Sequence, residues 1–82
     1  MYPELVPAGD ALPLVVKLSG KSMYAVSVEM GRVPSYLATT IGRKSIPTLA
    51  TAAEIAEHCE YRLVLVPNRE DIPLNSIVIS PE

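Results

Sequence analysis

Apolar residues between residues 22 and 42 form two short runs at three- and four-residue steps, with Gly31 between them. The apolar positions are Val26, Met30, Val33, Leu37 and Ile41. This period puts each run on one face of a helix, and Pro34 suits the start of the second helix because its φ is already fixed. Helices joined so tightly cross steeply, so we expect small Ser27 at the crossing. A positive φ at Gly31 would complete a helix-turn-helix.

Two more helices are predicted around this pair. The first begins at Asp10 as N-cap, with Pro13 tolerated in its first turn, and Ser19-Gly20 ends it. Its inward residues are Leu14, Val15 and Leu18. Residues 1–9 contain two prolines and a glycine, so we expect an irregular or extended lead-in.

Capping residues mark the remaining helix boundaries. Ser22 is the expected N-cap of the second helix, and Gly42 ends the third. Thr48, after Pro47, is the expected cap of a fourth helix that reaches about Cys59. The inward face predicted for this helix consists of Leu49, Ala52, Ala53, Ile55, Ala56 and Cys59.

The apolar period changes to two in residues 61–66 and again in residues 76–80, which predicts two strands. Pro67 and Pro73 bound the polar connection, and the simplest arrangement is a hairpin. Because an isolated hairpin is only marginally stable, we expect one face on the helices and the other in a homodimer interface. The residues expected at that interface are Leu63, Val64, Leu65, Val66, Ile77, Val78 and Ile79.

The predicted fold is mainly α, with four to five short helices that include a helix-turn-helix, plus a C-terminal β-hairpin. The 82 residues form a single domain, with a lead-in at 1–9, a helical core at 10–60 and the hairpin at 61–80. A chain of this length buries only somewhat more than roughly 60% of its unfolded surface, so help from a partner subunit is plausible.

Charge is distributed unevenly along the chain. Residues 12–46 carry five basic residues against one acid, a net charge of +4, whereas the rest carries two basic residues and eight acids, a net charge of −6. The overall charge of −2 by itself disfavours a nucleic-acid partner, because phosphate contacts need Lys and Arg. The basic segment reverses this expectation for one end of the molecule.

Residues 22–61 resemble the lambda-repressor-like, Cro-type helix-turn-helix family. The matching motifs are the opening Ser22, the pairs Val26-Ser27 and Met30-Gly31, the Pro47-Thr48 cap and the Ile55-Ala56 pair. Three features depart from the family pattern, one of which is the absence of the Glu that the family usually has near the end of the recognition helix. Met23 stands where the family usually has Gln, and Arg32 follows the turn glycine where an aliphatic residue is usual.

The resemblance implies a sequence-specific DNA-binding transcriptional regulator that acts as a homodimer on double-stranded DNA. Its third helix would enter the major groove. The candidates for reading bases are Arg32, Ser35, Tyr36 and Thr39. The candidates for phosphate contacts are Lys21, Ser22, Arg43 and Lys44.

Two other functions remain open at the level of sequence. One is an antitoxin-type repressor whose C-terminal part holds a toxin protein; the other is a protein-interaction module of the same fold without DNA binding. An enzyme is not expected, because nothing assembles a nucleophile, a base and an oxyanion donor. No metal or other cofactor is expected either, and a single cysteine together with the absence of a long apolar run predicts a cytoplasmic protein.

Overall fold

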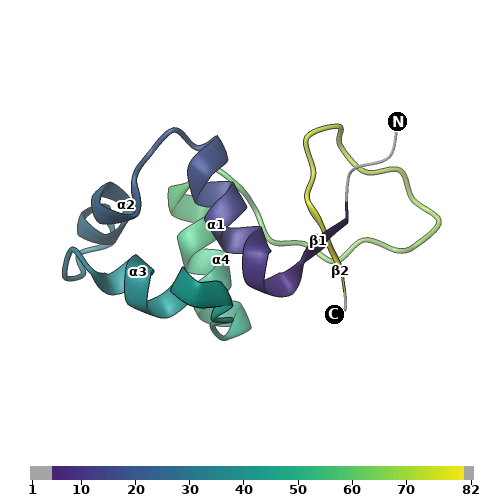
Figure 1. Cartoon of the computed structure of the whole chain (residues 1–82). Coiled ribbons are helices and arrows are strands. Elements are labelled where there is room, and N and C mark those ends of the chain that lie inside the picture. Colours follow the sequence, from purple (N-terminus) through teal and green to yellow (C-terminus); the bar gives the residue numbers. More distant parts are fainter. Residues whose placement is uncertain (1–4, 81–82) are drawn as a thin grey trace.

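Four helices form one end of the molecule, and a small sheet with the C-terminal segment forms the other (Figure 1). The computed structural model describes residues 5–80. Its elements are β1 (Leu5–Pro7), α1 (Ala8–Leu18), α2 (Met23–Glu29), α3 (Tyr36–Ile41), the 3-10 turn η1 (Gly42–Lys44), α4 (Leu49–His58) and β2 (Val78–Ser80). The prediction of a small, mainly helical protein is confirmed. None of these helices is both long and apolar enough to cross a bilayer.

The core lies where the four helices meet. Its buried residues are Leu12, Val15, Val16, Val26, Leu37, Ile41, Ile55 and Cys59. Burial raises the pKa of the Cys59 thiol, which keeps it protonated and apolar in this setting. Two residues predicted to face inward do not, since Leu18 is 56% exposed and Leu49 is 78% exposed. Leu18 is the last residue of α1 and Leu49 the first of α4.

Helix α1 begins three residues earlier than the sequence predicts, because its N-cap is residue 7 and not residue 10. The chain passes directly from β1 into the helix, with Pro7 as the N-cap, so Asp10 lies in the first turn instead of capping it. In this position the Asp10 carboxylate still interacts favourably with the positive end of the helix dipole. Pro13 consequently lies inside the helix and not in its first turn.

The predicted hairpin is wrong. Residues 61–66 form no strand, and β2 pairs with β1 in a parallel sheet, with Leu5 opposite Val78 and Pro7 opposite Ser80. Turns follow Pro67 and Pro73, where the N–H groups of Glu70 and Ser76 donate to the proline carbonyls. The connection therefore makes a wide loop (Figure 1) and returns parallel to the N-terminal strand.

Candidate nucleic-acid interface

Ser27 fixes the contact between α2 and α3. Its side chain is fully buried, its hydroxyl donates to the Met23 carbonyl at 2.7 Å, and the same oxygen accepts from the Leu37 N–H at 3.0 Å. The first N–H groups of a helix lack intrahelical partners, so α2 supplies through Ser27 the acceptor that α3 needs. The predicted small residue at the crossing is confirmed, with the additional role of capping α3.

Local chemistry also sets the boundaries of α2. The Ser22 hydroxyl accepts from the Ala25 N–H at 3.0 Å, as expected of an N-cap. At the other end Gly31 has a φ of +75°, a conformation that glycine adopts without steric penalty. Both expectations for this helix are confirmed, and the Ser22 hydroxyl is exposed but engaged in capping.

The connection between α2 and α3 is longer than predicted. Helix α3 begins at Tyr36, two residues after Pro34, so Met30 to Ser35 separate the helices, compared with the 3–4 residues typical of a helix-turn-helix. Val33 is not packed in the core, since it is 66% exposed. Val33 precedes Pro34, and the residue before a proline disfavours the α conformation. The chain forms a turn here, closed by a hydrogen bond from the Tyr36 N–H to the Val33 carbonyl.

Helix α3 exposes a narrow, uncharged face. Leu37 and Ile41 are fully buried, whereas Ser35, Ala38 and Thr39 are exposed. The sequence predicts Ala38 beside the buried positions. In the structure Ala38 is exposed, because it lies three residues after Ser35 and therefore shares the exposed face of the helix with it. Together with α2, α3 lies at the end of the molecule farthest from the sheet (Figure 1).

Arg32 and Tyr36, two candidates for reading bases, contact each other and other parts of the protein. The Arg32 guanidinium lies 4.9 Å from the centroid of the Tyr36 ring, and its Nη2 is 3.7 Å from Oε1 of Glu54 on α4. Tyr36 is also half-buried against the core. An exposed ion pair contributes little to stability, so Arg32 can leave Glu54 at small cost.

Arg43 and Lys44 follow α3 directly and have unusual backbone conformations. Their φ values are +54° and +62°, a region that costs a non-glycine residue about 1–3 kcal/mol. Both side chains are exposed, and within residues 5–80 neither has a carboxylate at ion-pair distance. The turn packs against α1, because a Cβ on Gly9 would lie 2.7 Å from the Lys44 carbonyl oxygen.

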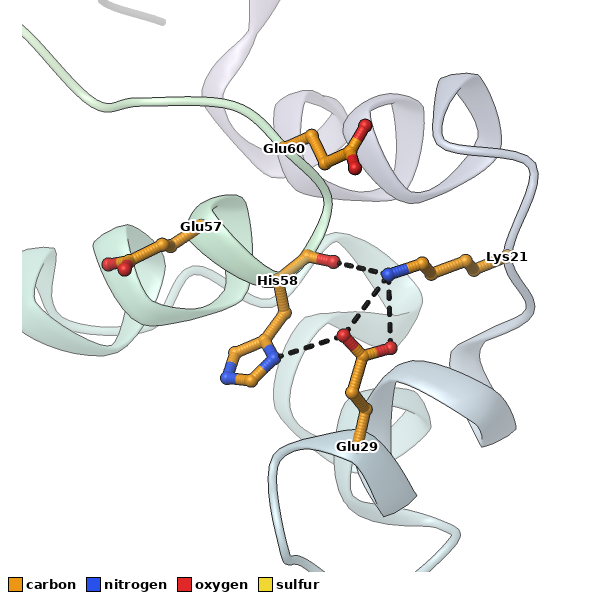
Figure 2. Close-up of a pocket in the computed structure, with 5 residues that line it drawn as sticks. All are labelled: Lys21, Glu29, Glu57, His58 and Glu60. Carbon is orange, nitrogen blue, oxygen red and sulfur yellow. Dashed lines mark hydrogen bonds and ion pairs between the residues drawn. The ribbon is translucent and has the colours of Figure 1, made fainter.

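Lys21, a candidate for phosphate contact, is instead held by the protein (Figure 2). Its Nζ is 3.0 Å and 3.1 Å from the two carboxylate oxygens of Glu29 and 2.9 Å from the His58 carbonyl oxygen. The His58 Nδ1 lies 3.5 Å from Glu29 Oε1. This cluster joins the loop after α1, helix α2 and the C-terminal end of α4, where a cation is favoured by the helix dipole.

The hydrogen bonds from Lys21 and His58 lower the pKa of the Glu29 carboxyl below its usual 4.5, and the bond to Glu29 raises the pKa of Lys21. A lowered carboxyl pKa contributes stability above pH 4.5, and that contribution disappears as the pH falls through the folded-state value. Glu29→Gln is therefore expected to lower the urea midpoint at pH 7 and to have a smaller effect at about pH 3.

Glu57→Gln is the matched control. Glu57 lines the same pocket (Figure 2) but forms no ion pair with any residue between 5 and 80, so its replacement is expected to change neither midpoint. An equal loss at both pH values for Glu29→Gln would assign its effect to packing and not to charge.

Among residues 5–80, no three His, Cys, Asp or Glu side chains lie close enough together to hold a metal ion. What this part of the chain offers is an uncharged helix face followed by two cations without a carboxylate partner among residues 5–80. Comparison of the sequence and the structure with known proteins gives no matching family model, no matching curated protein and no matching solved structure.

Proposed function

We propose that this chain is a sequence-specific DNA-binding transcriptional regulator that binds double-stranded DNA as a homodimer. In this proposal α2 and α3 act as a helix-turn-helix, and α3 lies in the major groove. The observation that carries the proposal is the surface of α3 and of the turn after it. Helix α3 exposes an uncharged face, and Arg43 and Lys44 in the turn have no carboxylate partner within the described residues.

The exposed face of α3 suits close approach to base edges. Hydroxyl groups such as those of Ser35 and Thr39 donate to or accept from several bases, and an alanine methyl such as that of Ala38 can contact the thymine methyl. All three side chains are short, so the helix backbone can lie deep in the groove. Arg32 and Tyr36 flank this face and extend the readout at its N-terminal end.

Phosphate contacts are assigned chiefly to Arg43 and Lys44. Backbone contacts fix the position of a protein on the duplex, and both residues follow the helix that would lie in the groove. Lys21 is less suited to this role, since Glu29 already neutralises it. Two copies related by a two-fold axis would set their α3 helices about 34 Å apart, one turn of the duplex.

Salt dependence tests this proposal directly. Duplexes selected from a random pool would be bound by the unchanged chain and by the double variant Arg43→Gln/Lys44→Gln at several salt concentrations. Each lost phosphate contact removes about 0.9 from the slope of log K against log salt, so the double variant is expected to bind more weakly with a slope shallower by about 1.8 per subunit.

Arg69→Glu provides the control, because it changes net charge by the same −2 in the loop between Pro67 and Pro73. It is expected to retain the original slope. Binding that is independent of salt, or equal slopes for the unchanged chain and the double variant, would contradict the proposed function.

A protein-interaction role without DNA binding is the second candidate. It is favoured by the internal pairing of Lys21 and Arg32 with Glu29 and Glu54, which leaves fewer free cations for phosphate. An antitoxin-type repressor combines both roles and would use the exposed apolar C-terminal segment for its toxin. Retention of a partner protein by a chain that fails to bind any selected duplex would favour the interaction module.

A further inference from the structure

Residues 63–66 are apolar, and the segment from residue 62 to residue 66 belongs to no helix or strand of the described chain. Leu65 is fully exposed, and Leu63, Val64 and Val66 are 39%, 58% and 40% exposed. Among residues 5–80 no backbone hydrogen bond involves this segment. Unpaired backbone groups flanked by β-branched and aliphatic side chains are a template for pairing with another strand.

The accessible surface of the chain is large for its mass. The chain exposes 6239 Å² for 8.9 kDa, whereas a compact monomer of that mass exposes about 4,800 Å². The exposed apolar side chains of residues 63–66 contribute to this excess, and pairing with another strand would remove part of their surface from water. The radius of gyration agrees, at 12.7 Å against about 11.7 Å for a compact domain of this length.

We propose that residues 62–66 pair as an antiparallel strand with the same segment of a second copy, across a two-fold axis at Val64. The pairing places Leu63 opposite Leu65 and Arg62 opposite Val66 of the other copy. The proposal deepens the homodimer of the proposed function and rests on it for the role of the dimer, but the pairing itself requires no DNA.

Self-pairing suits the chemistry of this segment. Residues 63–66 carry no charge, so a two-fold axis at Val64 brings no like charges face to face. Five residues is the usual length of a strand, and Pro67, which has no N–H, ends the ladder. Leu5 and Ile79, one on each strand of the sheet, are also exposed, at 65% and 46%.

Solution mass and crosslinking test the pairing. The unchanged chain is expected to sediment at twice 8.9 kDa without DNA. Val64→Lys places two ammonium groups opposite each other and is expected to give a monomer with an unchanged helical circular-dichroism spectrum. Val33→Lys, which alters a similarly exposed valine in the turn before α3, is expected to stay dimeric. Val64→Cys is expected to form an intermolecular disulfide in air, which the buried Cys59 of the unchanged chain does not.

A monomeric unchanged chain at every concentration, or a Val64→Lys variant that remains dimeric, would overturn the pairing. In the first case a different protein, such as the toxin of an antitoxin-type repressor, would have to cover the segment. The outcomes separate from those of the DNA experiment. A dimer that binds no duplex keeps the interface and removes the function, whereas a monomer that binds duplexes in a salt-dependent way keeps DNA binding and removes the pairing together with the homodimer.

Discussion

Replacement of Ile55 by alanine is expected to lower the free energy of unfolding by about 2–5 kcal/mol. Ile55 is fully buried on α4, in contact with a core to which α1, α2 and α3 also contribute, so truncation leaves a cavity that no single neighbour can fill. A domain of 82 residues has a total stability of about 4–12 kcal/mol, so this one change removes a large part of it.

Leu49→Ala is the matched control within the same helix. Leu49 is 78% exposed at the first residue of α4, and its truncation is expected to change stability by less than about 0.5 kcal/mol. Urea unfolding followed by circular dichroism, at one protein concentration for all variants, measures both effects. Equal losses of stability for the two variants would mean that Leu49 is buried as the sequence periodicity predicts, and would contradict the exposure seen in the structure.

Gly9→Ala is expected to destabilise the protein by about 1–3 kcal/mol because of overpacking. The added methyl would lie 2.7 Å from the Lys44 carbonyl oxygen and 2.8 Å from the Lys44 Cβ, and a backbone oxygen cannot move away alone. Helix propensity predicts the opposite sign, since alanine is favoured over glycine by up to about 1 kcal/mol in a helix interior. The sign of the change therefore decides between the two effects.

Gly42→Ala is the control for Gly9→Ala. A Cβ at Gly42 meets no atom within 4 Å, and the φ of −70° is open to any residue, so the substitution is expected to be neutral or stabilising by about 0.4–1 kcal/mol. Thermal unfolding of both variants at neutral pH measures the difference. A Gly9→Ala protein as stable as Gly42→Ala would show that α1 and η1 do not touch as described.

Features that depend on near neighbours in the chain were predictable. The caps at Ser22 and Thr48 and the positive φ of Gly31 all follow from chemistry within three or four residues, and the structure confirms each. The small size of Ser27 predicts its place at the helix crossing. Its hydrogen bond to Leu37 was not predictable, because the partner lies ten residues away on another helix.

Features that depend on distant partners were not predictable. The period of residues 61–66 indicates a strand but does not identify the partner, and the strand that β2 joins is a three-residue element at the other end of the chain. The ion pairs of Lys21 and Arg32 were not predictable for the same reason. Their carboxylate partners, Glu29 and Glu54, are eight and 22 residues away, so the sequence shows two cations where the structure shows two ion pairs.

The contact between Gly9 and Lys44 has a mechanical consequence for the whole assembly. Only Ala8 stands between the end of β1 and Gly9, so no hinge separates the sheet from the turn that carries Arg43 and Lys44. The sheet, the start of α1 and the turn that carries Arg43 and Lys44 are therefore expected to move as one rigid unit.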